Sequence, residues 1–246
     1  MYYKIIFSLL IIVLTSCNTY KSLDTALANP LEVKSLNLSK QGLVQLSPEI
    51  SKLKNLEKFV LFKNKLKSLP PEIGELTNLK VLFVGGNKLE TLPPEIKNLK
   101  RLKKLSLQFN EIKSLPDEIG ELDSLEYLDL QFNDLTILPV TIDNLKNLEF
   151  IYLNNNKLVA INPGICKLTN LTRLIIGKNQ LEYDLPSDLG NLENLIELDV
   201  SHSGNLLKIP ESIRNMRRLE YLFIDNTTLL PSSIITMNPR LQIIRK

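Results

Sequence analysis

Apolar residues recur at a fixed interval along most of the chain. Seven Leu or Val residues stand 23 positions apart without a slip, and units of 24 residues follow them. The seven are Val33, Leu56, Leu79, Leu102, Leu125, Leu148 and Leu171; the units from Leu171 and Leu195 run 24 residues, and the one from Leu219 is shortened. One unit of this length cannot bury its own apolar side. The pattern therefore predicts a solenoid whose core lies between stacked neighbours.

Each unit contains two kinds of hydrophobic pattern. Its first residues alternate, as where Leu128 and Leu130 flank Asp129, and this alternation predicts a strand with one buried face. Its second half reads Leu-Pro-x-x-Ile-x-x-Leu, and the proline permits a turn or the first turn of a short helix but no continued strand. We therefore expect an α/β solenoid with a parallel concave sheet and short helical or 3-10 segments on the convex side.

An asparagine recurs in the turn that leaves each strand. These residues are Asn64, Asn87, Asn110, Asn133, Asn156 and Asn179. The backbone of such a turn is buried, and a side-chain amide offers two donors and an acceptor to groups that would otherwise be unpaired. The sequence thus predicts a structural ladder in which each amide binds the loops on either side.

The two ends depart from the repeat. Gln41 replaces the asparagine of the first unit, which is typical of a capping repeat. Residues 22–30 combine a serine, apolar residues at helical spacing and a final proline, and predict a short capping helix within residues 17–32. Residues 33–246 then form nine repeats and a partial last strand at residues 241–244. Because no capping segment follows, we expect an open C-terminal sheet edge.

The first residues differ in character from the repeats. Lys4 precedes an apolar run over residues 5–14 that is short for a membrane span and typical of a secretory signal. Leu14-Thr15-Ser16-Cys17 resembles a bacterial lipobox, which implies a signal peptide over residues 1–16 and a lipidated Cys17. We therefore expect a lipid anchor in the bacterial cell envelope, at the outer membrane. The alternative is an ordinary cleaved signal with an incidental cysteine.

Composition and charge narrow the function. A net charge of +3, with basic and acidic residues mixed in every repeat, gives no footprint for nucleic acid. His202 is the only histidine, so neither a metal trio nor a Ser-His-Asp set is expected. Cys166 is the only cysteine after Cys17 and cannot form an internal disulfide. We expect no enzyme, no cofactor and a stability that depends on the repeat core.

The residues between the core leucines of each strand are expected to face solvent on the concave side. Two apolar clusters arise there, namely Val60, Phe62, Val81 and Phe83, and then Tyr127, Phe150, Tyr152 and Ile175. The predicted partner-binding set adds Lys104, Asp129, Arg173, Glu197, Asp199, Tyr221 and Phe223. Exposed apolar patches with aromatic anchors are typical of protein-binding surfaces. The alternative is that the rings only stabilise the sheet by packing together.

Charge changes sign along the same concave face. Lys58 and Lys104 lie toward the N-terminal half, whereas Glu197, Asp199 and Asp225 lie toward the C-terminal end. Such a gradient would orient a single partner. The acidic trio is also a candidate for Ca²⁺, although that cation needs six or more oxygen ligands and no loop has the pattern of a metal loop.

Two repeats carry the sequence Leu-Pro-Pro-Glu-Ile, at residues 69–73 and 92–96. With the 23-residue period, this resembles the bacterial leucine-rich repeat proteins, and the lead-in at residues 29–33 is similar to leucine-rich repeat lipoproteins of spirochaetes. The resemblance implies a membrane-anchored module that captures a protein ligand, host molecules included, and it implies no catalytic residue. Two alternatives stay open. One is a self-associating envelope protein, and the other is carbohydrate binding on Tyr127, Phe150, Tyr152 and Tyr221.

Overall fold

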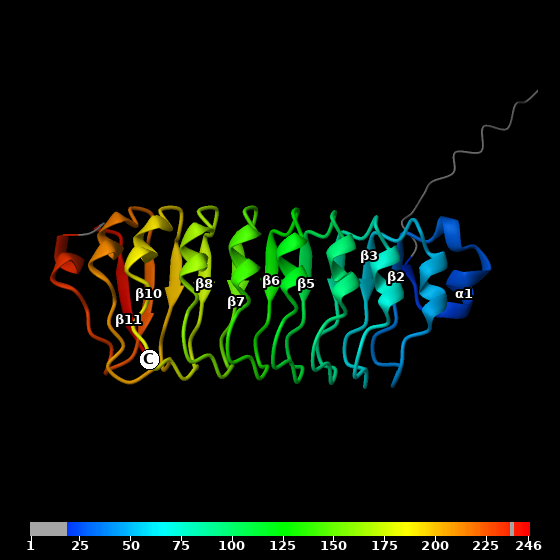
Figure 1. The fold of residues 1–246 in the computed structure, drawn as a ribbon, viewed down its shortest axis with the longest axis horizontal. Coiled ribbons are helices and arrows are strands. Elements are labelled where there is room, and N and C mark those ends of the chain that lie inside the picture. The colour runs from blue at the N-terminus through cyan, green and yellow to red at the C-terminus, as the bar shows by residue number, and fades with distance from the viewer. Residues whose placement is uncertain (1–18, 237–238) are drawn as a thin grey trace, which may run out of the picture.

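The repeats lie side by side along the long axis of the protein, from the helix α1 to the strand β11 (Figure 1). A computed structural model describes residues 19–236 and 239–246. Over these residues the chain forms one sheet of eleven parallel strands, and each strand pairs with the next strand in the sequence. The predicted solenoid with a parallel sheet and short 3-10 segments is confirmed.

The strands are short and keep one register throughout. They are β1 (Thr19–Tyr20), β2 (Ser35–Asn37), β3 (Lys58–Val60), β4 (Val81–Phe83), β5 (Lys104–Ser106), β6 (Tyr127–Asp129), β7 (Phe150–Tyr152), β8 (Arg173–Ile175), β9 (Glu197–Asp199), β10 (Tyr221–Ile224) and β11 (Gln242–Arg245). Lys58 pairs with Val81, and Val81 pairs with Lys104. Because the register equals the repeat, equivalent positions form straight rows across the sheet.

The return half of each repeat forms a 3-10 helix on the convex side. These helices are η2 (Pro48–Lys52), η3 (Pro71–Glu75), η4 (Pro94–Asn98), η5 (Asp117–Glu121), η6 (Val140–Asn144), η7 (Pro163–Lys167), η8 (Ser187–Asn191), η9 (Glu211–Asn215) and η10 (Ser232–Thr236), and a further short one, η1 (Pro30–Glu32), precedes the first repeat. In η3 the preceding Pro70 has φ −70° and ψ 152°, and Ile73 is buried. The proline fixes an extended entry, and the tight turn then directs the isoleucine into the core.

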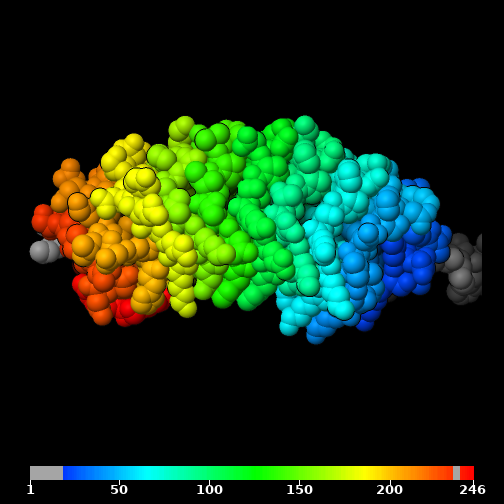
Figure 2. Space-filling model, turned by 60° about the horizontal axis from the view of Figure 1, so that its bottom comes forward, coloured from blue at the N-terminus to red at the C-terminus, as the bar shows by residue number. Residues whose placement is uncertain are grey.

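The repeat leucines and isoleucines form one continuous hydrophobic core. Figure 2 shows the repeats stacked without interruption from the blue N-terminal end to the red C-terminal end. Cys166, in η7, is buried in this core. Burial, with a smaller contribution from the charge of Asp188, raises the pKa of the Cys166 thiol to about 11. The thiol therefore stays protonated at neutral pH and acts as a small core residue.

The N-terminal end contains the helix α1 (Leu23–Ala28), in the segment expected to be helical. Ala26 is fully buried in the core. Ser22 occupies the N-cap position but its side chain makes no capping hydrogen bond. Before the helix, Thr19–Tyr20 pairs with β2. The sequence did not predict this strand, because two residues are too few to show a period of two.

The sheet has β1 and β11 at its two edges. The predicted signal peptide and Cys17 lie outside the described residues, so the structure does not bear on them. Within residues 19–236 and 239–246, no helix is both long enough and apolar enough to span a membrane.

The predicted asparagine ladder is present, with one difference in its connections. The Asn110 amide nitrogen donates to the carbonyls of Val84 and Leu107 at 3.1 and 2.8 Å, and its oxygen accepts from the Leu89 N–H at 3.0 Å. Each amide therefore joins its own turn to the preceding repeat, rather than to the loops on both sides. The ladder ends at Ser203, whose hydroxyl donates to the Ile176 carbonyl at 2.8 Å.

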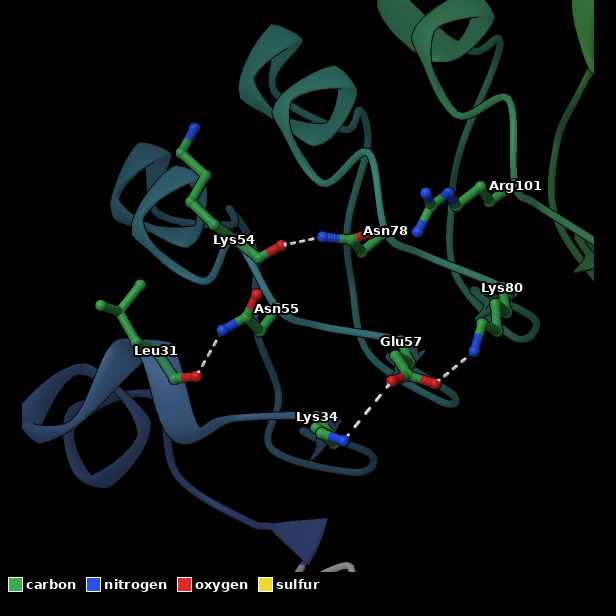
Figure 3. A network of polar contacts seen from close by, with 8 residues as sticks. All are labelled: Leu31, Lys34, Lys54, Asn55, Glu57, Asn78, Lys80 and Arg101. Carbon is green, nitrogen blue, oxygen red and sulfur yellow. Dashed lines mark hydrogen bonds and ion pairs between the residues drawn. The ribbon is translucent and has the colours of Figure 1, made fainter.

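A second ladder of amides runs along the opposite ends of the strands (Figure 3). Asn55 donates to the Leu31 carbonyl at 2.7 Å, and Asn78 donates to the Lys54 carbonyl at 2.9 Å. Arg101 in turn donates to the Asn78 side-chain oxygen at 2.7 Å. These side chains are more exposed than the first ladder, and their spacing of one repeat carried no hydrophobic signal that would have identified them.

Ion pairs accompany the second ladder. Glu57 lies 2.6 Å from Lys80 and 3.9 Å from Lys34, so its carboxylate connects three repeats (Figure 3). The hydrogen bond from Lys80 holds the pKa of Glu57 below its usual value. Exposed pairs of this kind contribute only about 0–1 kcal/mol each. These ion pairs neutralise charge at the N-terminal ends of the strands and contribute little to the stability of the fold.

Candidate functional site

The concave face consists of two rows of side chains that the common register aligns. One row contains Lys58, Val81, Lys104, Tyr127, Phe150, Arg173, Glu197 and Tyr221. The other row contains Val60, Phe83, Ser106, Asp129, Tyr152, Ile175, Asp199 and Phe223. The residue between them on each strand, such as Phe59 or Leu82, is buried in the core. Alternation along a strand places the two rows on the opposite, concave side.

A hollow of about 470 Å³ lies on the N-terminal half of the concave face. We call it the concave hollow, and its lining residues are Ser39, Val60, Phe62, Phe83, Gly85, Lys104, Ser106, Gln108, Tyr127 and Asp129. Three members of the first predicted apolar cluster line it, and the fourth, Val81, does not. Tyr127 comes from the second predicted cluster and completes the apolar wall. The volume is in the range of about 300–1,000 Å³ that is typical of ligand pockets.

Gly85 helps to keep the concave hollow open. A Cβ at this position would lie 3.0 Å from Cγ of Gln108 and 3.3 Å from Cδ2 of Phe62. Both distances are shorter than ordinary carbon contacts, which fall at about 3.5–4.0 Å. The glycine thus lets the Phe62 ring and the Gln108 amide approach the strand end without a side chain between them.

Asp129 is one of the residues that line the concave hollow and is only 2% exposed. Its carboxylate accepts hydrogen bonds from Ser106 at 3.2 Å, from Tyr127 at 3.4 Å and from the Gln131 side chain at 3.0 Å. Burial, reinforced by the charge of Asp129, raises the pKa of the Tyr127 phenol. The phenol therefore keeps its proton and donates. Asp129, predicted as a binding residue, holds its neighbours in place within the wall.

The second predicted cluster is packed against itself. The Tyr127 ring lies 6.3 Å from Phe150 and 5.5 Å from Tyr152, measured between centroids. These distances are within the range of favourable aromatic pairs, and the expected contact of neighbouring strands is confirmed. The rings of this cluster are half-buried. Their packing is compatible with both predictions, a binding patch and a stabilised sheet.

Arg173 connects this cluster to the acidic end of the face. Its guanidinium lies 5.9 Å from the Phe150 ring centroid, and its Nε lies 3.0 Å from Glu197. A hydrogen bond to the Tyr152 hydroxyl, at 3.5 Å, contributes most to raising the pKa of Arg173 above its usual value. The arginine and Glu197 therefore neutralise one another within the protein.

The other carboxylates of the acidic end are also matched internally. Asp199 lies 2.6 Å from the ammonium group of Lys246, which sits 4.1 Å from the Phe223 ring centroid. Asp225 accepts hydrogen bonds from its own turn and from the His202 N–H. Over the part of the chain that the structure describes, no group of three or more His, Cys, Asp or Glu side chains is placed to hold a metal ion. The predicted charge gradient is present in sequence but is largely cancelled at this end.

Sequence reasoning missed a pair of exposed aromatic residues beside the concave face. The Phe109 and Phe132 rings stack with centroids 4.4 Å apart and planes 10° apart, and they are 49% and 42% exposed. Both residues have positive φ, 55° and 53°, which is uncommon for bulky side chains. Both residues occupy the eighth position of a repeat, directly after Gln108 and Gln131, so a period of 23 relates them, but this turn position lies outside the strand alternation that identified the concave residues.

Comparisons with known proteins found matches to both the sequence and the solenoid architecture. The sequence profile described as a leucine-rich repeat region matches residues 7–110 and 94–182. A solved leucine-rich repeat protein of Leptospira interrogans is 29% identical, with a TM-score of 0.58, over 93% of this chain and 76% of that protein. None of the curated proteins compared by sequence matches the chain.

Two further solved structures resemble it. The leucine-rich repeat ectodomain of the membrane receptor kinase GASSHO1/SCHENGEN3 of Arabidopsis thaliana is 33% identical, with a TM-score of 0.74, over 86% of this chain but only 26% of that ectodomain. Internalin C2 of Listeria monocytogenes is 23% identical, with a TM-score of 0.70, over 80% of this chain and 83% of that protein, a likeness of fold alone. The sequence profile spans most of the solenoid, and the chain belongs to the leucine-rich repeat family.

Proposed function

We propose that the protein is a non-enzymatic binding module that holds a protein ligand on its concave sheet. The observation that carries this proposal is the concave hollow, where Val60, Phe62, Phe83 and Tyr127 leave an apolar surface uncovered. A sheet face in contact with water is usually polar, and a contiguous apolar patch there is typical of an interaction site.

Two observations support a binding module over an enzyme. Asp129 and Asp199 are the concave groups best suited to acid–base chemistry, and both are buried and engaged by neighbouring side chains. The Arabidopsis ectodomain that resembles the chain was solved in complex with Casparian strip integrity factor 2, so that relative holds a ligand. The present chain spans about a quarter of that ectodomain, and its own ligand is a separate question.

We also propose that the module is anchored in the bacterial envelope through a lipid on Cys17. The support is sequence alone, namely the apolar run over residues 5–14 and the Leu14-Thr15-Ser16-Cys17 motif. An anchor at the outer membrane would present the concave face to molecules at the cell boundary, host proteins included.

The experiment is a capture from envelope and host extracts with the purified protein and two variants. The double variant Phe62→Ala with Phe83→Ala removes two rings from the concave hollow. We expect its affinity for the captured ligand to fall by tenfold or more, since truncating a central aromatic anchor costs about 2 kcal/mol or more. Affinities of the identified ligand are then measured by calorimetry.

Tyr183→Ala is the matched control, because Tyr183 is an exposed aromatic residue outside the sheet. It should capture the same ligand as the wild type with unchanged affinity. Circular dichroism and light scattering would check that all three proteins fold alike and stay monomeric. Equal capture by the hollow variant would place the binding surface elsewhere, and a concentration-dependent increase in mass would favour the self-associating envelope protein.

A further inference from the structure

The concave face carries a net positive charge in its N-terminal half. Of the carboxylates on or beside the two rows, Glu197 and Asp199 form ion pairs with Arg173 and Lys246, whereas Asp129 and Asp225 accept hydrogen bonds from uncharged groups and keep their negative charge. In the N-terminal half, the two positive charges of Lys58 and Lys104 therefore outnumber the single negative charge of Asp129.

Among the described residues of the two concave rows, Lys58 and Lys104 are the cations without an anionic partner. Both are exposed, and neither ammonium group lies within 4.0 Å of a carboxylate anywhere in the described chain. The lysines directly before the strands differ. Lys80 and Lys103, at the N-terminal ends of β4 and β5, pair with glutamates one repeat away at 2.6 Å. Glu57 and Glu126 therefore pair with lysines at the strand ends, and the two concave lysines are left to pair with carboxylates of a ligand.

The two lysines flank the concave hollow in a defined way. Lys104 lines it, and Lys58 lies in the same row two strands away, which corresponds to about 10 Å at the usual strand spacing. A third lysine, Lys63, lies at the other end of β3 with its ammonium group 5.3 Å from the Phe62 ring centroid. The apolar walls of the hollow thus lie between positive charges on two sides.

The hollow also offers polar groups suited to a peptide backbone. The Gln108 side chain lines it, and an amide can donate to a carbonyl and accept from an N–H. The Ser39 and Ser106 hydroxyls also line the hollow. They donate to Asn37 and Asp129, and their oxygens can still accept a hydrogen bond. An extended main chain presents alternating N–H and C=O groups, which match such a lining.

We infer that the partner of this face binds through an extended peptide segment in which an apolar side chain is flanked by carboxylates two or three residues apart. The apolar side chain occupies the concave hollow, and the carboxylates pair with Lys58 and Lys104. This inference rests on the proposed function and adds the chemistry of the ligand. Charge complementarity selects the acidic segment, and the uncovered rings select its apolar residue.

The test is a selection from random displayed peptides of about twelve residues, which span about 40 Å when extended. The immobilised wild-type protein should enrich peptides that place Asp or Glu around Phe, Leu or a similar residue. The best peptide is then synthesised and titrated by calorimetry, together with a copy in which each Asp or Glu is replaced by Ser. We expect the neutral copy to bind about tenfold more weakly.

Two double variants separate local charge from overall charge. Lys58→Glu with Lys104→Glu reverses the concave lysines, while Lys67→Glu with Lys97→Glu makes the same change of net charge outside the strands and the hollow. The first should weaken the acidic peptide by about tenfold or more and should instead enrich basic peptides in a new selection. The second should alter affinity by less than about threefold, because screening limits charge effects beyond about 10 Å.

The outcomes distinguish this inference from the proposed function. Enrichment of neutral or basic peptides that the lysine variant binds equally well, but that Phe62→Ala with Phe83→Ala no longer binds, would overturn the acidic segment and leave concave binding intact. Peptides insensitive to both pairs of substitutions would overturn both proposals. A selection that enriches nothing would exclude extended segments as the ligand class, and the extract capture would then decide the proposed function by itself.

Discussion

A single carboxylate, that of Asp225, organises the turn after β10. It accepts hydrogen bonds from the Thr227 N–H at 2.8 Å, the Thr227 and Thr228 hydroxyls at 2.7 and 3.0 Å, and the His202 N–H at 2.7 Å. Burial by itself would raise the pKa of Asp225, but the hydrogen bonds outweigh it and hold the pKa below its ordinary value. The charged form is thus the one that the folded protein stabilises.

We therefore expect Asp225→Asn to lower the free energy of unfolding by about 1–3 kcal/mol at neutral pH. Because the folded-state pKa is depressed, this stabilisation is present above the ordinary pKa and is lost as the pH falls through the folded-state value. Urea denaturation of both proteins at about pH 7 and about pH 3 should show a smaller difference at the lower pH. Asp117→Asn, at an exposed position, should change neither. A difference that does not depend on pH would exclude the carboxylate charge as the cause.

At the scale of the element, each turn is stabilised by the repeat before it. The buried Asn110 amide makes four hydrogen bonds with main-chain groups, two of them in the preceding repeat. At the opposite ends of the strands, the exposed Asn55 and the partly exposed Asn78 also bind the preceding repeat, each with one hydrogen bond to a main-chain carbonyl. The two ladders differ in how much a lost hydrogen bond costs, because water can replace the bond only in the exposed ladder.

Asn110→Ala should therefore lower the free energy of unfolding by about 2–4 kcal/mol, because buried groups of Val84, Leu89 and Leu107 lose their partner. Asn78→Ala should cost less than about 1 kcal/mol, because water reaches the Lys54 carbonyl. Guanidinium denaturation measures both values, and neither variant should change ligand affinity directly. Equal losses would argue that burial does not determine the contribution of these amides.

At the scale of the whole molecule, the solenoid offers one long binding face and, by our proposal, a single tether at its N-terminal end. The helix α1 and the strand β1 lie at that end (Figure 1). A lipidated Cys17 would place the first repeats, and with them the concave hollow, nearest to the membrane. Stable anchoring of this kind needs more than one acyl chain, as diacylation supplies.

Cys17→Ala should move the protein from the membrane fraction to the soluble fraction, because the acceptor of the lipid is lost. Detergent phase partition of bacterial cells that express either form measures the change. Cys166→Ala is the matched control and should remain in the membrane, because Cys166 is a buried core residue. If the Cys17 variant still partitions into detergent, the anchor is not this cysteine, and an uncleaved or ordinary signal would have to be considered.

Much of the fold and part of the surface could be predicted from the spacing of hydrophobic residues. The period of 23 identified the buried leucines, the strand faces, the convex turns and the buried asparagines, because burial repeats wherever the backbone repeats. It also identified the concave rows, in which the Tyr127 ring contacts the rings of Phe150 and Tyr152. The Phe109–Phe132 stack escaped, since a turn position with positive φ follows no strand alternation.

The sequence by itself determined the solenoid, its core and the face on which a ligand would be expected. Only the tertiary structure decided which groups on that face are available. Asp199 belongs to the acidic end in sequence, yet Lys246, 47 positions later, neutralises it, while Lys58 and Lys104, at the concave hollow, have no ion pair with any described residue. The physical reason is distance along the chain. Burial has a local period that a sequence records, whereas charge pairing and the shape of a hollow depend on side chains that only folding brings together.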